Sequence, residues 1–383
     1  MASLILSKYN ATPANASAAA PTEGCAMSLM TPISHFDGSR RALQPMSRVE
    51  DTRAAAGDFR RDMLAKPTVR YYESFELVRV PYPAKFAYLN AFTRPTPFVH
   101  LCNRLFVIQF DSSEGLKTLL VSPSDWEHQR ETPFFAQLDA MAGPLTGVMD
   151  SLMVRTPNTV LGVLAKIGLK PEDIDYITYD HLHTQNVTRW LGSADRPGLL
   201  PNAKLLIMRE EWESAKGLLP WHNQWYCPGG IADVPDDKLV LLDDSVFLGD
   251  GSVALVRSKG HTEGNHSIVA HTEGGLFVTS ENGVSLDAYE PKFSKIPGLA
   301  AYAKQTGAEI IINGNTQEYV VDQYISMVAE KTIAGPSVRD PRFPNVAPSS
   351  EAMAFWLFPS TAPTVTVGNL RYGTLTHSAE LAS

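Results

Sequence analysis

Two histidines stand two residues apart, where an apolar run gives way to polar residues. Residues 174–179 are rich in β-branched and aromatic side chains and predict a short strand, which Asp180, His181 and His183 follow. Two imidazoles released from a strand end into a loop can bind one metal ion through neutral ring nitrogens. A lone pair of loop histidines is more often solvated or hydrogen-bonded, so a metal site needs further ligands.

Three later apolar runs also end in polar loops that carry candidate ligands. Each run has the length and composition of a buried strand. They are residues 253–256 before His261, residues 276–280 before Glu281, and residues 309–312 before Asn313-Gly314-Asn315. The sequence therefore predicts four strand ends that present polar side chains in order along the chain.

This ordered set resembles the metallo-β-lactamase superfamily. Its members carry an H-x-H-x-D-H loop, a Gly-His-Thr-x-Gly-His loop, a bridging Asp and a last His. The resemblance covers about residues 70–335 and includes the Pro-Glu-Asp-Ile-Asp entry at residues 171–175 into the first ligand strand. It implies an α/β fold, a four-layer α/β/β/α sandwich, with extensions at both ends.

Carried over residue by residue, the resemblance implies a single metal site. The family's Asp and second His of the first loop fall on Gln185 and Asn186, and its last His falls on Asn315. Amide side chains are weak, uncharged ligands that would not hold a second dication. We therefore expect one metal ion, zinc or alternatively iron. Its expected ligands are His181, His183, His261 and Glu281.

Neighbouring side chains have expected roles beside these ligands. Asp180 either orients a ligand histidine from behind or caps its loop. Glu281 is one methylene longer than the Asp that it replaces, so it is either a ligand or a hydrogen-bond acceptor. Gln185 takes the place of the Asp that helps to hold the nucleophile, although an amide cannot take up a proton. The family's second His of the later loop falls on Asn265, and we expect a structural hydrogen bond from His266.

The surviving ligands support one main function and two alternatives. As a hydrolase, the site would use a metal-bound hydroxide on an ester, thioester, lactone or amide of a small molecule. The first alternative is a mononuclear non-haem iron oxygenase, because His181 and His261 with Glu281 would form a two-histidine, one-carboxylate face. Persulfide dioxygenases of the same superfamily look similar in this respect. The second alternative is a metal-free binding protein, which three matched histidines disfavour.

Composition bounds the class of protein and its partners. Hydrophobic residues make up 44% and charged residues 19%, as in soluble globular proteins. A formal net charge of -8 disfavours a nucleic-acid partner. Because no run approaches the ~20 apolar residues of a membrane helix and no signal-peptide pattern stands near residue 1, we expect a cytoplasmic protein. Three scattered cysteines do not make a disulfide framework.

Three regions are expected along the chain. Residues 1–68 predict an extension, partly disordered or with a short solvated helix whose Ser47 and Glu50 have capping-box spacing. Residues 69–335 form the main domain, and residues 336–383 a tail that packs on it, with a homodimer contact or a lid as alternatives. Within the main domain, the apolar pattern predicts a hairpin of residues 104–110 with 117–122. It also predicts helices at residues 161–169, 299–306 and 318–332.

The substrate pocket is expected to come from two segments, residues 124–151 and 218–237. The second contains Trp221, Trp225 and Tyr226, which would form an apolar or aromatic wall.

Overall fold

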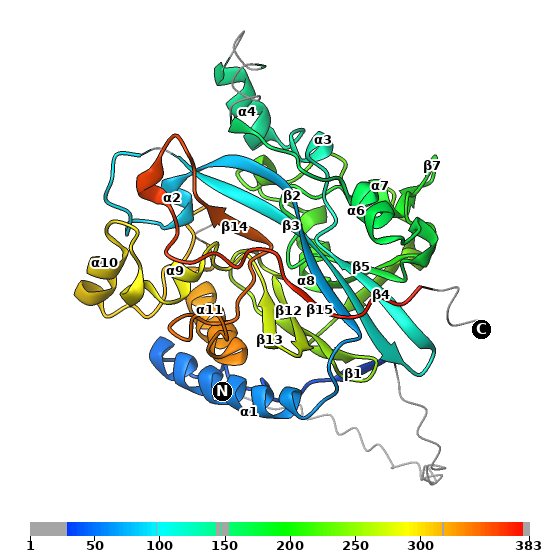
Figure 1. Ribbon diagram of the computed structural model, residues 1–383, viewed down its shortest axis with the longest axis horizontal. Helices are drawn as coiled ribbons and strands as arrows, with labels where there is room; N and C mark the ends of the chain where they lie inside the picture. Colours follow the sequence, from blue (N-terminus) through cyan, green and yellow to red (C-terminus); the bar gives the residue numbers. More distant parts are fainter. Residues whose placement is uncertain (1–28, 97, 143–146, 148–152, 316–317, 378–383) are drawn as a thin grey trace, which may run out of the picture.

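The computed structural model describes residues 29–96, 98–142, 147, 153–315 and 318–377. Within these residues, a five-stranded and an eight-stranded sheet lie face to face, and helices cover their outer faces (Figure 1). The predicted four-layer α/β/β/α sandwich is confirmed.

The five-stranded sheet is antiparallel throughout, in the order β1-β10-β11-β12-β13. Its strands are β1 (Met30–Pro32), β10 (Val246–Leu248), β11 (Val253–Arg257), β12 (His266–Thr272) and β13 (Gly275–Thr279). The strands expected at residues 253–256 and 276–280 are confirmed as β11 and β13.

The larger sheet has the order β15-β2-β3-β4-β5-β8-β9, with β14 also paired to β3. Strands β4, β5, β8 and β9 run parallel, and the predicted hairpin is β3 with β4. The bounds are β15 (Arg371–Gly373), β2 (Tyr71–Pro83), β3 (Phe98–Ser112), β4 (Gly115–Val121), β5 (Tyr176–Thr178), β8 (Lys204–Met208), β9 (Leu239–Leu242) and β14 (Ser350–Met353).

Helices α1 (Pro45–Leu64) and α11 (Val320–Ala334) cover the five-stranded sheet. Helices α6 (Val160–Ile167), α7 (Val187–Leu191) and α8 (Arg209–Lys216) pack on the outer face of the larger sheet. The remaining short elements are α2 (Ala84–Ala87), α3 (Trp126–Gln129), α4 (Pro133–Ala142), α9 (Leu286–Tyr289), α10 (Leu299–Thr306), β6 (Gly192–Ser193) and β7 (Arg196–Pro197). No described helix has both the length and the apolar character needed to cross a membrane.

Strand periodicity divides the core into two clusters. On β3, Phe106, Ile108 and Phe110 face the space between the sheets, whereas Leu105 and Val107 face the outer helices. Successive side chains of a strand point to opposite faces, so a strand that is apolar throughout is buried on both. This double burial fixes the strand register that places the loops at the sheet ends.

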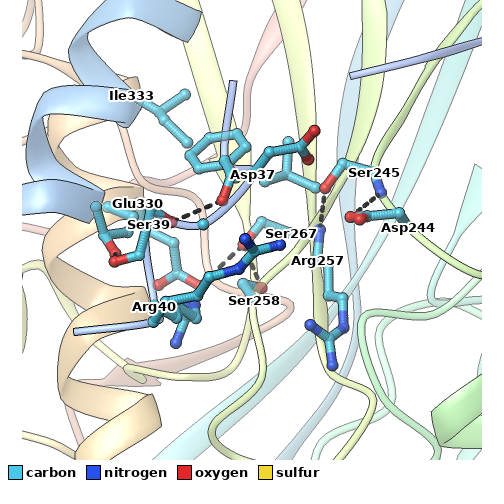
Figure 2. A pocket seen from close by; sticks show the side chains of 16 residues that line it. Asp37, Ser39, Arg40, Asp244, Ser245, Arg257, Ser258, Ser267, Glu330 and Ile333 are labelled. Atoms are coloured by element: carbon cyan, nitrogen blue, oxygen red, sulfur yellow. Dashed lines mark hydrogen bonds between the residues drawn. The ribbon is translucent and has the colours of Figure 1, made fainter. Parts of the chain in front are cut away.

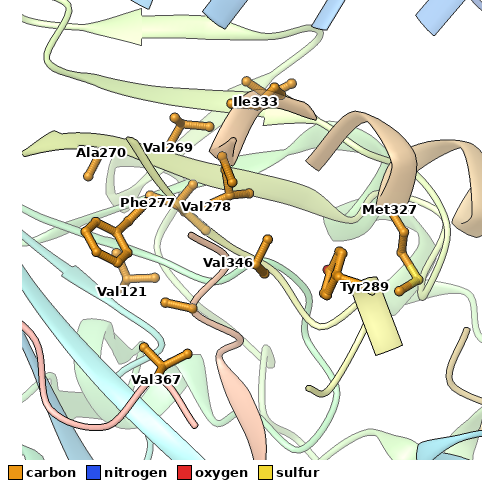
Figure 3. Packing of buried hydrophobic residues seen from close by; sticks show 14 of the residues in the cluster. Val121, Val269, Ala270, Phe277, Val278, Tyr289, Met327, Ile333, Val346 and Val367 are labelled. Carbon is orange, nitrogen blue, oxygen red and sulfur yellow. The ribbon is translucent and has the colours of Figure 1, made fainter. Parts of the chain in front are cut away.

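Aromatic and branched side chains fill the space between the sheets. Phe277 of β13 stacks on Tyr72 of β2, with ring centroids 5.6 Å apart. Figure 3 shows Phe277 beside Val121 of β4, so side chains from both sheets meet there. Burial of this kind contributes roughly 1.5–3 kcal/mol per large apolar side chain.

The N-terminal segment differs from the expected solvated extension. Helix α1 is 20 residues long, follows Gln44 rather than starting at Ser47, and has a buried face. Its Phe59 stacks on Phe247 of β10 at 5.7 Å, and β1 pairs with the same strand. Residues 30–64 are therefore part of the sandwich, and residues 1–28 lie outside the described residues.

The C-terminal tail packs on the domain as expected, and it does so as strands. Strand β14 pairs with β3, and β15 pairs with β2. The ring of Phe355 stacks on His100 with centroids 3.8 Å apart. By contrast, the strand expected at residues 309–312 is wrong, because this segment is irregular and the N–H of Ile311 donates to the carbonyl of Ala288 at 2.8 Å.

Candidate metal centre

Loops from both sheets meet at one end of the sandwich. Strand β5 leads into Asp180, β11 into His261 and β13 into Glu281. The carbonyl of Asp180 accepts from the N–H of His266 at 2.9 Å, and its Oδ2 accepts from the N–H of Glu281 at 2.6 Å. These two contacts join the loop after β5 to the second sheet.

The structure brings together the three histidines on which the sequence analysis rests. One ring nitrogen from each of His181, His183 and His261 lies within 4.8 Å of the others. Nδ1 of His183 is 3.1 Å from Nε2 of His261. Their exposed fractions are 3%, 5% and 0%, so the cluster is shielded from bulk water.

Two of the histidines have a polar atom behind the ring. Oδ2 of Asp180 is 3.3 Å from Nδ1 of His181, and Oδ1 of Asn313 is 3.2 Å from Nδ1 of His261. Both rings therefore direct Nε2 toward the cluster, whereas His183 directs Nδ1. A partner behind an imidazole selects its tautomer and orientation.

Glu281 lies beside the cluster. Its carboxylate oxygens are 3.9 Å from Nε2 of His181 and 3.8 Å from Nε2 of His261, beyond hydrogen-bond distance. The side chain is buried. Glu281 therefore faces the same nitrogens that the three-histidine cluster gathers.

Burial and neighbouring charges set the protonation of the cluster. Burial lowers the pKa of His183 and of His261 well below the usual value, so both rings are neutral at pH 7. Burial also opposes the charged form of His181, but Asp180 and Glu281 outweigh it and raise its pKa to about 9. Burial raises the pKa of Glu281 to about 7.

This donor set fits a metal ion. The neutral rings of His183 and His261 have lone pairs, and they converge with the ring of His181 in a buried space with a carboxylate beside them. Three protein ligands with an open fourth position is the arrangement of catalytic zinc sites. Within the described residues, this is the one cluster of at least three His, Cys, Asp or Glu side chains close enough to hold an ion.

The residues at the family's second-site positions have other partners. Oδ1 of Asn186 accepts from the N–H of Arg189 at 3.0 Å, and so caps α7. The hydroxyl of Ser124 donates to Oε1 of Gln185. Asn315 lines the same cavity as the histidines.

Sequence reasoning missed Glu211, a carboxylate from α8 that joins the two histidine loops. It is fully buried and accepts from the N–H of Leu182 at 2.8 Å, the hydroxyl of Thr262 at 2.6 Å and the N–H of Gly264 at 3.2 Å. An acidic residue beside Trp212 on the buried face of a short helix was the available signal.

Sequence reasoning also missed Asn313 and Ser349. Asn313 was noted only as part of a strand-end loop, yet it contacts His261 directly. Ser349, just before β14, donates to Oδ2 of Asp180 at 2.8 Å. By contrast, His266 makes the expected structural hydrogen bond, with Nε2 3.0 Å from Oγ1 of Thr178.

One cavity contains two of the histidines, and a second shares Gln185 with it. The smaller, of about 40 Å³, is lined by His181, His183, Gln185 and Glu281 together with aromatic residues that include Phe134 and Trp225. The larger is a groove of about 560 Å³, lined by Leu182, Gln185, Tyr226, Cys227, Ile231 and others. Trp225 and Tyr226 therefore line the site as expected, whereas Trp221 is exposed.

A separate cavity of about 270 Å³ lies between residues 36–41, α11 and strands β11 and β12 (Figure 2). Two of its arginines are already paired. Arg40 donates to the hydroxyl of Ser326 at 2.7 Å, and Arg257 pairs with Glu210 at 2.6 Å. Opposite charges are balanced around this cavity, and we assign it no ligand.

The inner wall of that cavity supports the loop of His261. Oε1 of Glu330 accepts from the amide of Asn282 at 2.7 Å, and the hydroxyl of Ser267 lies 2.9 Å from the same oxygen. Oδ1 of Asn282 in turn accepts from the N–H of His261 at 2.8 Å. The loop is thus held by a buried polar network, in which each bond is strengthened by exclusion of water.

Comparison with known proteins gives relatives over part of the chain. No family model matches. Over 133 residues, 34% of this chain and 47% of each relative, identity is 27% to the N-acyl homoserine lactonase of a Bacillus species and 29% to that of Bacillus cereus. The chain therefore spans about half the length of the curated relatives it matches.

A solved N-acyl homoserine lactone hydrolase, with the product N-hexanoyl-L-homoserine at its catalytic metal centre, aligns with 68% of this chain and 87% of its own. The identity is 15% and the TM-score 0.45. The relatives in sequence are lactonases, in agreement with the resemblance to the metallo-β-lactamase superfamily that the histidine loops carry. The chain is similar to N-acyl homoserine lactonases along about 34% of its length.

Proposed function

We propose that the protein is a metal-dependent hydrolase that opens the ring of a small lactone. The convergence of His181, His183 and His261 in a buried cavity carries this proposal. The likeness to lactonases supports the choice of substrate class. A metal ion bound there would lower the pKa of a bound water molecule toward ~7 and polarise a carbonyl oxygen.

The protein's own residues would hold and orient this centre. Neutral His183 and His261 offer lone pairs without first losing a proton. Asp180 and Asn313 keep Nε2 of His181 and His261 directed at the cluster. Glu281 would stand beside the ligands, because its oxygens lie near both of these nitrogens and its charge would balance that of a cation.

We propose one zinc ion per chain. Three histidines are ligands that zinc accepts in a tetrahedral site whose fourth position stays open for water. At the second-site positions, Asn186 is occupied as a helix cap and Gln185 accepts from Ser124. Neither amide supplies the negative charge that a second dication would need.

The two cavities suggest what kind of lactone fits. The 40 Å³ cavity beside the histidines has room for little more than the reacting group. The 560 Å³ groove beside it has apolar walls, among them Leu182, Ala215 and Ile231. A lactone that carries an apolar substituent would place the substituent in the groove, where it is removed from water.

One observation favours a second candidate, a mononuclear iron oxygenase. Glu281 lies at nearly equal distance from His181 and His261, as in a two-histidine, one-carboxylate face on Fe(II). This face would leave His183 as an additional donor. The identity of the bound metal separates the two candidates.

The hydrolase proposal is tested by acid release from a lactone panel. Purified protein would be mixed with N-acyl homoserine lactones of increasing chain length and with unsubstituted lactones, and carboxylate formation followed by pH-stat titration. We expect ring opening that stops on chelation and returns with zinc. Zinc-loaded protein that opens none of these lactones would contradict the proposal.

A further inference from the structure

Gln185 lines two cavities, one of which contains two of the histidines. It lines both the 40 Å³ cavity that contains His181, His183 and Glu281 and the 560 Å³ groove. A substrate that reaches the histidine cluster would therefore lie beside Gln185. Its side chain is buried, so water competes little for its hydrogen-bonding groups.

The orientation of the Gln185 amide is fixed by a buried serine. The hydroxyl of Ser124 donates to Oε1, and Ser124 is itself buried. Because the amide oxygen faces Ser124, the amide nitrogen is directed elsewhere. Among the described residues, Nε2 of Gln185 has no hydrogen-bond partner, and it is not one of the buried polar atoms sealed from solvent. Nε2 is therefore a donor without a partner among the described residues, on a side chain that lines both cavities.

The backbone of Gln185 is held as firmly as its side chain. Its N–H donates to the carbonyl of Leu182 at 3.2 Å. Gly230 packs against its carbonyl so closely that a Cβ on Gly230 would lie 2.4 Å from that oxygen. A donor held by its backbone and its own carbonyl group needs no rearrangement when a substrate arrives.

We propose that Gln185 is a catalytic residue whose Nε2 donates a hydrogen bond to the carbonyl oxygen of the substrate. This inference rests on the proposed lactone hydrolysis. In that reaction water adds to the carbonyl carbon, the ring C–O bond breaks, and the released oxygen takes up a proton, which gives a hydroxy acid. The carbonyl oxygen gains negative charge as water adds, and a preorganised N–H in a water-poor cavity stabilises that charge.

Glutamine suits this task better than the acid that the resemblance places there. A carboxylate would repel the developing negative charge, whereas an amide nitrogen can only donate. Ser124 is a positioning residue in this account, because it contacts Gln185 and not the substrate. Gln185, which stands where the resemblance places an Asp ligand of the second site, would thus supply a neutral donor at the reacting carbonyl.

The test compares three variants of the zinc-loaded full chain. Gln185→Met keeps the side-chain length and removes the donor, and Ser124→Ala releases the amide. Gln224→Met is the matched control, because that amide bonds only its own loop at the carbonyl of Trp221. For Gln185→Met we expect kcat on the best lactone to fall about 10²–10³-fold, the cost of removing one oxyanion donor, with a small change in KM. The kcat of Ser124→Ala should fall by a smaller factor, and the kcat of the control Gln224→Met should not change.

Two further readouts separate this role from a structural one. The zinc content of Gln185→Met should equal that of the wild type by elemental mass spectrometry. Its affinity for a cyclic phosphonate that mimics the tetrahedral state should fall in calorimetry, while affinity for the uncleaved lactone changes little. Full kcat in Gln185→Met, or loss of its zinc, would overturn the inference and leave the hydrolase proposal standing. A wild type that opens no lactone would overturn both.

Discussion

At the scale of single residues, one buried carboxylate holds the two histidine loops of the candidate centre together. Glu211 accepts from the loop that carries His181 and His183 through the N–H of Leu182, and from the loop that carries His261 through Thr262. Its burial raises its pKa, and the three donors around it offset the cost of burying a charge. Glu211 thereby fixes the separation of histidines that belong to different sheets.

Replacing Glu211 by Gln should weaken both the fold and metal binding. One carboxylate oxygen becomes an NH₂ group that faces hydrogen-bond donors, so buried donors lose their acceptor at about 1–3 kcal/mol each. Zinc affinity should fall roughly 10–100-fold, the usual effect of losing a partner behind the ligands. Competition with a fluorescent chelator measures the zinc affinity. Urea unfolding measures the stability of the fold.

Glu210→Gln is the matched control, because Glu210 precedes Glu211 on α8 and pairs with Arg257 near the surface. This variant should bind zinc as the wild type does. Equal zinc affinity in Glu211→Gln and Glu210→Gln would show that Glu211 does not position the histidines.

The sequence predicted which histidines converge but not what supports them. His181 and His183 could be identified from their spacing at a strand end, and the later motif added His261. The partner of His261 is 52 residues away, and that of Leu182 is 29 residues away. Such contacts form only when separate elements pack, so no local pattern carries them.

At the scale of elements, a buried ion pair fastens the C-terminal strands to the larger sheet. Arg104 of β3 donates to Oε2 of Glu351 of β14 at 2.6 Å through Nη2, and neither side chain is more than 2% exposed. Oε1 of Glu351 accepts from the N–H of Val367 at 2.6 Å. The pair links three segments, and β14 leads back to Ser349 at the candidate centre.

Removing Glu351 should be strongly destabilising. Glu351→Ala would leave the guanidinium of Arg104 buried without its carboxylate, at a cost of about 3–5 kcal/mol. The free energy of unfolding, from urea titration, measures this. Asp340→Ala breaks the surface pair with Arg342, and should destabilise the protein far less, because solvent screens exposed charges. Similar losses in the two variants would contradict the importance of the buried pair.

A second contact of the tail predicts a dependence of stability on pH. His100 of β3 is stacked on Phe355, and burial lowers its pKa from 6.5 to about 4. Between pH 4 and pH 6.5, His100 binds a proton in the unfolded chain but not in the folded chain. The free energy of unfolding should therefore fall as the pH drops from 6.5 to 4, by up to about 1.4 kcal/mol per pH unit for this group.

The variant His100→Gln isolates this contribution. Glutamine cannot titrate, yet it can donate to the carbonyl of Met153, which lies 2.9 Å from Nε2 of His100. The other buried histidines are unchanged in this variant. It therefore loses only the part of the pH dependence of unfolding free energy that is due to His100. Urea unfolding at pH 7.5, 6 and 5 should give a shallower slope for the variant, and identical slopes would exclude the effect.

Elements with strong periodicity were predictable, and those defined by long-range packing were not. The hairpin of β3 with β4 and helix α10 lie where the apolar pattern places them. Helix α1 has buried residues at positions 49, 52, 56, 59 and 63, a helical stripe in a charged segment. Its burial depends on β10 and α11, which lie far along the chain. Ile310 and Ile311, in the segment expected as a strand, are buried without a strand partner.

At the scale of the whole molecule, the two sheets have separate tasks. The larger sheet supplies His181 and His183, the five-stranded sheet supplies His261 and Glu281, and their ends meet at one edge. The centre therefore forms only when the sheets pack. A homodimer and a cytoplasmic location stay predictions from the sequence.

The central claim is that three histidines hold one metal ion, and metal content tests it most directly. Protein purified without added metal would be analysed by elemental mass spectrometry beside His261→Ala and a surface control, His222→Ala, whose ring pairs with Glu318 at 3.1 Å. We predict one zinc per chain in the wild type and the control, and none in His261→Ala. One iron would favour the oxygenase. Two ions per chain, or the same content in His261→Ala as in the wild type, would contradict the claim.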